Sequence, residues 1–192
     1  MQITRAGKTL VVPGPAGPES YLFASVAEAK GRAAFIAEAL SWIGTPFVDC
    51  ADVKGRNGAV DCAMLLTRCA VDTGLVPAFD PRPYAPQWHV HHDEELFLQF
   101  LTDRLGAREI TDPRPGDIAV FKFHRTYAHG TVILNSAEMV HAWSGYKMVM
   151  RTGRTEGHFV HTLGTPRPVR YFDLWSVTAA ASYRALRSQE TT

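Results

Sequence analysis

The sequence has no excess of charge of either sign. Twenty Lys and Arg residues stand against 19 Asp and Glu residues, a formal net charge of +1 at pH 7. Binding to nucleic acid or to an anionic membrane favours a concentrated basic face. No apolar run approaches the roughly 20 residues that cross a bilayer. We therefore predict neither nucleic acid nor a membrane as a partner.

Export signals and cysteine pairs are also scarce. The first 17 residues contain only the short apolar run 10–12, so we expect a protein made in the cytoplasm without a signal peptide. The three cysteines are Cys50, Cys62 and Cys69. Their odd number argues against a disulfide framework. No CxxC motif occurs, so no structural zinc site is predicted. We expect no metal and no cofactor.

The 192 residues suit one domain with a sizeable core. Neither a repeat nor a linker is evident, so residues 1–192 are interpreted as a single domain. Prolines and glycines predict an irregular lead-in over 1–20, and residues 176–192 read as a polar, helix-prone tail. Apolar spacing predicts helices over about 25–42, 62–73 and 94–106, and strands follow at 118–123, 129–134, 138–143, 146–151 and 169–175. Helices followed by an antiparallel sheet make an α+β fold.

The candidate nucleophile is Cys62. The motif Val-Asp-Cys-Ala occurs at 48–51 and again at 60–63, but only Cys62 stands at the first turn of a predicted helix, after the N-cap candidate Asp61. Free N–H groups and the helix dipole favour a thiolate there and can stabilise an oxyanion. We expect Cys62 to be a reactive thiolate near neutral pH, unlike Cys50 beside two aspartates and Cys69 on the apolar stripe. A purely structural cysteine is the alternative.

His129 and His141 are the candidate partners of this nucleophile. If Asn135, Ser136 and Ala137 form the loop between their strands, the two-residue period places both histidines on one sheet face as diagonal neighbours. His129 then serves as general base and His141 orients it. On spacing alone, two half-buried structural histidines are an equally good interpretation.

The remaining histidines carry weaker signals. His89, His91 and His92 lie in a proline-rich loop, where a surface or substrate-wall role is favoured over a metal site. His124, His158 and His161 are in polar surroundings and are predicted to be surface residues.

Five segments, taken in their order along the chain, resemble the NlpC-type cell-wall cysteine peptidases. They are Ala-Leu-Ser-Trp-Ile-Gly-Thr-Pro-Phe, Asp-Cys opening a helix, Arg-Pro-Gly-Asp-Ile-Ala-Val-Phe, His-Gly-Thr-Val-Ile-Leu and Met-Val-His-Ala-Trp. The resemblance runs from about Ser41 to Trp143. It implies a papain-like fold, with N-terminal helices packed on a C-terminal antiparallel sheet. It also implies Cys62 as nucleophile, His129 as base and His141 as third member of the triad.

The resemblance also suggests substrate contacts, in which the chain departs from the family pattern. Phe47 replaces a common tyrosine, and Ala63 replaces the serine that helps the preceding aspartate hold a free amino end of the peptide. Asp61 remains but the serine does not, so an intact cross-linked stem is at least as good a substrate as a free L-Ala terminus. Trp143 and Trp88 are further candidates for substrate contact, whereas Trp42 is predicted to be core.

The resulting hypothesis is hydrolysis of an amide bond in the peptidoglycan peptide stem, next to γ-D-glutamate. The 79–92 loop and the 128–134 strand resemble the phage and prophage tail branch. Tail proteins are therefore candidate partners, and action at the cell wall after delivery in a virion is a candidate setting. The alternatives are an N-acetylmuramoyl-L-alanine amidase or another amide hydrolase on the same triad, and a catalytically silent tail scaffold.

Overall fold

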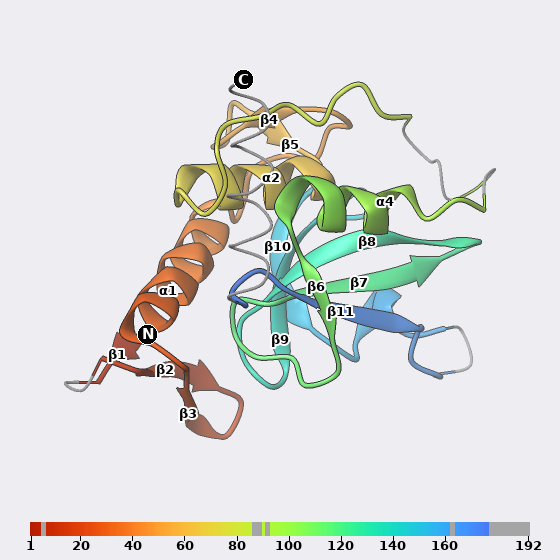
Figure 1. The fold of residues 1–192 in the computed structure, drawn as a ribbon. Coiled ribbons are helices and arrows are strands. Elements are labelled where there is room, and N and C mark those ends of the chain that lie inside the picture. The colour runs from red at the N-terminus through yellow and green to blue at the C-terminus, as the bar shows by residue number, and fades with distance from the viewer. Residues whose placement is uncertain (5–6, 86–89, 91–92, 162–163, 177–192) are drawn as a thin grey trace.

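The computed structural model describes residues 1–192 apart from 5–6, 86–89, 91–92, 162–163 and 177–192. Its centre is a six-stranded antiparallel sheet in the order β10-β9-β8-β7-β11-β6 (Figure 1). The strands are β6 (Arg108–Ile110), β7 (Ile118–Phe123), β8 (Thr126–Ile133), β9 (Glu138–Trp143), β10 (Met148–Gly153) and β11 (Val169–Asp173). Apart from β6, all match predicted strands, and the α+β prediction is confirmed.

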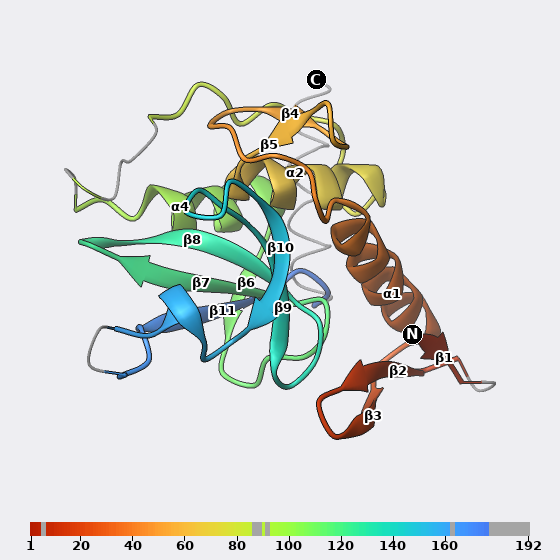
Figure 2. The ribbon, with the colours of Figure 1, turned by 180° about the vertical axis from the view of Figure 1, so that it is seen from behind.

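The helices precede most of this sheet in the chain. They are α1 (Val26–Ser41), α2 (Cys62–Asp72) and α4 (Leu96–Gln99), and α4 continues as the π-helical turn η1 (Phe100–Arg104). Both α2 and α4 pack against β8, while α1 packs against α2 and extends away from the sheet (Figures 1 and 2). The first two helices match the prediction, and the third begins two residues late. Within the described residues, no helix has the length and apolar character of a membrane span.

The predicted irregular lead-in over 1–20 is wrong. That segment holds β1 (Gln2–Ile3), β2 (Thr9–Gly14) and β3 (Gly17–Leu22), which form a three-stranded antiparallel sheet below α1 in Figure 1. Pro13, Gly14, Gly17 and Pro18 lie at the turn end of the β2–β3 hairpin, where Pro13 faces Pro18. Leu10 and Val12 are buried, an alternation typical of a strand with one covered face. The short pair β4 (Asp52–Val53) and β5 (Ala59–Val60) was also not predicted, and the tail beyond Ser176 lies outside the described residues.

Both faces of the central strands are covered. Val120, Val132 and Val140 belong to the main core with the helices. On the other face, alternate residues of β7, β8 and β9 pack around Phe159 of the 3-10 turn η2 (Gly157–Phe159). Strands covered on both faces have nearly continuous apolar sequences, which explains the clear strand signal over 118–123.

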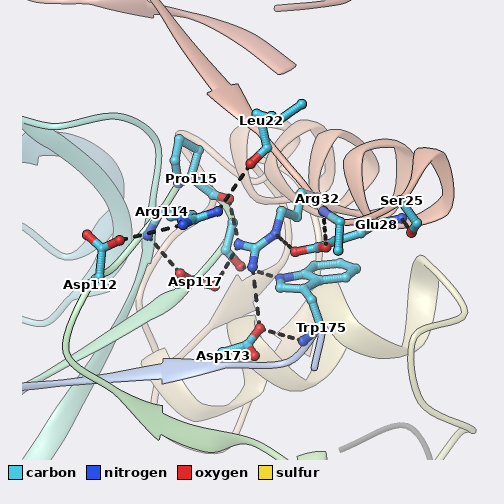
Figure 3. Close-up of polar contacts among 12 residues, drawn as sticks. Leu22, Ser25, Glu28, Arg32, Asp112, Arg114, Pro115, Asp117, Asp173 and Trp175 are labelled. Carbon is cyan, nitrogen blue, oxygen red and sulfur yellow. Dashed lines mark hydrogen bonds and ion pairs between the residues drawn. The ribbon is translucent and has the colours of Figure 1, made fainter. Parts of the chain in front are cut away.

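A buried arginine connects α1 to the sheet (Figure 3). Arg32 Nη1 lies 2.6 Å from Asp117 Oδ1 and also donates to the carbonyl of Pro115, while Nη2 lies 3.4 Å from Asp173. Its Nε donates to Glu28 at 2.9 Å. Burial raises the pKa of Asp117 to about 6, against the lowering effect of Arg32. The arginine therefore holds two buried carboxylates in place at the turn before β7 and at the end of β11.

Replacing Arg32 by leucine should destabilise the fold strongly. The change leaves Asp117 and Asp173 buried without their counter-charge, and breaking a buried ion pair costs about 3–5 kcal/mol. The free energy of unfolding, measured by urea denaturation, should fall by that amount. The matched control is Arg68→Leu, which removes a partly exposed ion pair within α2 and should cost less than about 1 kcal/mol. Equal effects of the two changes would contradict this account.

Candidate active site

Cys62 is the first residue of α2, as the sequence predicts. Asp61 is the N-cap, and its carboxylate accepts the N–H of Met64 at 2.8 Å. The half-buried Cys62 thiol lies 3.9 Å from the carbonyl oxygen of Ala128, and the N–H of Gly130 points toward its sulfur. The nucleophile candidate therefore lies against the backbone on both sides of His129.

The sheet joins the two predicted histidines. Val132 pairs with Val140 and Ile133 with Met139, the register that the three-residue loop requires. His129 Nε2 and His141 Nδ1 are 2.9 Å apart in a buried hydrogen bond. Burial lowers the pKa of His141 to about 3, so this imidazole is neutral at physiological pH. It can orient His129, and the bond leaves His129 Nδ1 as the ring nitrogen for proton exchange with a thiol.

Gly130 allows α2 and α4 to approach the strand that carries His129. A Cβ at this position would lie 2.7 Å from Leu66 Cδ1 and 2.7 Å from Phe97 Cζ. A side chain larger than hydrogen would therefore push these helices away from the strand. The glycine thus contributes to the spacing between the helix of Cys62 and the strand of His129.

A cleft of about 480 Å³ opens over these residues. Cys62 and His129 both line it, whereas fully buried His141 lies behind His129. Most of the other lining side chains are apolar or aromatic. They come from the 47–63 segment, the 81–85 loop, α4 with η1, the end of β7, β8, and β9 with the residue after it. A concave, mostly apolar surface with few polar groups is typical of a ligand site.

The thiol itself differs from the prediction. Burial and the nearby Asp61 carboxylate raise the pKa of Cys62 to about 12, and the N–H groups of Gly130, Cys62 and Ala63 oppose this only in part. The expectation of a preformed thiolate near neutral pH is therefore wrong. The predictions for Cys50 and Cys69 hold, because burial raises the pKa of both thiols. Attack by Cys62 then requires removal of its proton by a base during the reaction.

The alkylation rate of Cys62 should therefore depend steeply on pH. Below the pKa, the thiolate fraction rises about tenfold for each pH unit. The second-order rate constant with iodoacetamide, followed by peptide mass spectrometry, should be low at pH 6 and still rise above pH 9. A plateau reached near neutral pH would instead indicate a stable thiolate–imidazolium pair and contradict this account.

The Asp61 carboxylate already accepts hydrogen bonds from neighbouring residues of the chain. Besides the Met64 N–H, its carboxylate accepts the N–H of Cys50 at 2.7 Å and the hydroxyl of Tyr84 at 2.6 Å. Tyr84 also lines the cleft. Sequence reasoning did not single out this tyrosine, because the only signal was its position in an aromatic, proline-rich loop. It places a hydroxyl near the cleft, in a chain where Phe47 carries none.

The predicted substrate-contact residues have different placements. Phe47 and Trp143 line the cleft, and Trp143 is half-buried against His129 with ring centroids 4.9 Å apart. Trp88 lies outside the described residues, as do His89, His91 and His92. Trp42 is core, as predicted, with 1% of its surface exposed.

His158 was predicted to be a surface residue and is not one. Its ring stacks on Trp143 with centroids 3.9 Å apart and an angle of 6°, and its Nε2 is buried. The residue comes from η2, whose short sequence has no periodic pattern that could have placed it. His124 and His161 are exposed, as predicted.

Comparison with known proteins supports the fold. No protein-family model and no curated protein matches the chain. Among solved structures, the peptidoglycan hydrolase RipB from Mycobacterium tuberculosis has 17% identity and a TM-score of 0.50 over 79% of this chain and 68% of its own. The P60 domain of an antigen from M. avium subspecies paratuberculosis has 17% identity and a TM-score of 0.47 over 78% and 98%. The NlpC/p60 domain of the peptidoglycan hydrolase SagA has 16% identity and a TM-score of 0.43 over 72% and 96%.

The likeness to RipB bears on architecture alone, because an identity of 17% carries no residue roles. The order of elements, with a cysteine at the start of α2 and two histidines on β8 and β9, agrees with the resemblance in the sequence. The chain therefore has an α+β fold similar in architecture to that of the peptidoglycan hydrolase RipB.

Proposed function

We propose that this protein is a cysteine peptidase that hydrolyses an amide bond in the peptide stem of bacterial peptidoglycan, next to γ-D-glutamate. One observation carries the proposal: Cys62 at a helix N-terminus and His129, hydrogen-bonded to buried His141, line the same cleft. Nucleophile, base and orienting group are the components of covalent amide hydrolysis. The described fold is similar to that of RipB, a peptidoglycan hydrolase.

In the proposed reaction, His129 takes the Cys62 proton as sulfur attacks the carbonyl carbon of the scissile amide. The resulting oxyanion is stabilised by N–H groups at the start of α2, where Cys62 and Ala63 contribute the first donors. His129 then gives its proton to the leaving amine, and the C–N bond breaks to leave a thioester on Cys62. Water, deprotonated by His129, attacks the thioester and releases a carboxylic acid and the free thiol.

The hydrogen bonds that the Asp61 carboxylate already accepts affect which peptide stem can be cut. A carboxylate that already accepts three hydrogen bonds from Cys50, Met64 and Tyr84 has little remaining capacity for a peptide ammonium group. Ala63 supplies no hydroxyl to assist it. A stem whose L-Ala nitrogen is acylated by the lactyl group of the glycan should therefore be accepted at least as well as a free stem.

The cleft also carries charges that suit a peptide stem. Arg104 is the one cationic side chain among its described lining residues, and Asp49 and Asp103 are also there. The α-carboxylate of γ-linked glutamate and the side-chain amine of a diamino acid are complementary to such groups. This arrangement supports a substrate with charges of both signs.

The test is digestion of purified sacculi and of defined muropeptides, with products identified by mass. The proposal predicts cleavage after D-glutamate within the stem, with lactyl-linked stems cut at least as fast as free ones. Products cut between lactate and L-Ala would establish an amidase instead. No cleavage by a folded protein would favour the scaffold alternative. Cys62→Ala controls for contaminating hydrolases.

Replacing Trp143 by alanine should impair substrate binding more than turnover. The indole forms a wall of the cleft beside His129, and its loss removes apolar contact area. We expect KM for a muropeptide to rise about tenfold, or about 1.4 kcal/mol, with a smaller change in kcat. Trp143→Phe is the matched control and should retain most of the affinity. If Trp143→Ala unfolds, as shown by circular dichroism, the residue is core rather than substrate wall.

The setting of this activity is a proposal from the sequence resemblance. A protein made in the cytoplasm and carried in a phage or prophage tail would meet the wall peptide during penetration. Association with purified virions, detected by mass spectrometry of tail fractions, tests it.

A further inference from the structure

His158 brings a third imidazole to the back of the site. It stacks on Trp143, and its ring centroid lies 4.9 Å from that of His141. The Nε2 atoms of His141 and His158 are both buried, and neither has a hydrogen-bond partner within the described part of the chain. A buried polar atom without a partner is costly and often marks a ligand site. These two nitrogens have no role in the proposed hydrolysis.

Together with His129, the two residues have the composition of a metal site. One ring nitrogen from each of the three histidines lies within 4.8 Å of the others. Histidine side chains are among the commonest ligands of Zn²⁺ and similar ions, which they bind through a ring nitrogen.

We propose that His129, His141 and His158 form a binding site for a divalent transition-metal ion of the Zn²⁺ type, and that the bound ion switches off the hydrolytic site. The ion is an inhibitor here, not a cofactor. The binding part stands on the geometry alone, whereas the inhibition part rests on the proposed peptidase function.

The dimensions require a small adjustment. Zn–N bonds of about 2.0–2.1 Å in tetrahedral geometry place ligand nitrogens about 3.4 Å apart. The candidate nitrogens of the three histidines lie within 4.8 Å of one another. His158 lies on the three-residue turn η2, so a shift on the order of 1 Å brings its nitrogen into range. The nearby Arg167 opposes a second cation, so we expect micromolar rather than nanomolar affinity.

Inhibition follows from the ring nitrogens that catalysis needs. If the ion takes a nitrogen of His129, it competes with the proton transfers of that base. If it takes His141 Nε2, the proton of His141 must move to Nδ1, which then donates to His129 Nε2. Neutral His129 must in turn carry its proton on Nδ1, the nitrogen assigned to the Cys62 proton. Either mode of binding disables the base.

The binding test uses isothermal titration of ZnCl₂ into untagged protein. The background protein carries Cys62→Ala, which removes a competing thiol. It also carries alanine at His89, His91 and His92, because their H-x-H-H sequence can itself bind zinc. In this background, His158→Phe keeps an aromatic ring on Trp143 but removes both nitrogens. We expect it to weaken Zn²⁺ binding at least tenfold. The matched control, His161→Phe at an exposed histidine, should leave affinity unchanged.

Unchanged Zn²⁺ affinity in His158→Phe, or no binding by the background protein, would overturn the proposal. Thermal melts verify folding, and His158→Gln provides a second variant if the phenylalanine is not tolerated. In the enzyme with native Cys62, half-inhibition of muropeptide cleavage should need at least tenfold more Zn²⁺ after His158→Phe. If the unmodified enzyme shows no cleavage even with EDTA, the peptidase proposal fails, while the titration still decides whether the metal site exists.

Discussion

Replacing Cys62 by alanine should reduce muropeptide hydrolysis by about 10⁴-fold or more, because no other group takes over a missing nucleophile. The change removes one half-buried sulfur at the start of α2 and leaves the N-cap bond from Met64 to Asp61 in place. The fold should therefore survive, as circular dichroism and thermal melting can verify. Turnover is measured by chromatographic separation of the cleaved stems.

The matched control for this variant is Cys50→Ala. Cys50 lies in the other copy of the Val-Asp-Cys-Ala motif, and it is also half-buried. Its sulfur contacts the carbonyl of Tyr84 rather than the strand of His129. Activity should stay within about twofold of the unmodified protein. Full activity in Cys62→Ala, or its loss only in Cys50→Ala, would contradict the assignment of the nucleophile.

Replacing His129 by alanine should reduce turnover by about 10³–10⁴-fold, because the neutral Cys62 thiol then has no base. The raised pKa of Cys62 makes the proposed hydrolysis depend more on this base than it would with a preformed thiolate. His141→Ala should cost less, about 10–100-fold, since His141 positions His129 without exchanging a proton with substrate. Both effects are read from kcat/KM on one defined muropeptide.

Two further observations separate catalysis from structure in the histidine variants. His161→Ala, at an exposed position, should leave kcat/KM unchanged. For His129→Ala, raising the pH should restore part of the activity, because more Cys62 becomes thiolate without the base. A variant that retains more than about a tenth of the activity at neutral pH would exclude His129 as the essential base.

The part of the site carried by local sequence patterns was predictable. The N-cap aspartate, the start of α2 and the two-residue period of β8 and β9 each follow from neighbouring residues in the chain. The three-residue loop at 135–137 sets the register that brings His129 and His141 within 2.9 Å. Their pairing could therefore be inferred without knowledge of the rest of the fold.

Features that depend on distant segments were not predictable. The Tyr84 hydroxyl reaches Asp61 across 23 positions of sequence, and Cys50 donates to the same carboxylate across 11. The raised pKa of Cys62 reflects burial among several elements, which outweighs the local effect of the helix start. The stacking of His158 on Trp143 likewise depends on where η2 packs against the sheet.

The N-terminal error has a different cause. Proline and glycine were interpreted as breaking regular structure, although at Pro13, Gly14, Gly17 and Pro18 they close a hairpin. Proline is compatible with a strand at an edge or near a turn, where no ladder hydrogen bond is lost. The alternating burial of Leu10 and Val12 was the signal for this hairpin.

The central claim is that Cys62 forms a covalent thioester with the stem peptide. The most direct measurement is acid-quenched intact-protein mass spectrometry during turnover of a defined muropeptide, followed by peptide mapping. The account predicts a transient mass increase equal to the acyl half of the substrate, located on Cys62 and absent in Cys62→Ala. Turnover at full rate with no adduct on Cys62, or with the adduct on Cys50, would contradict it.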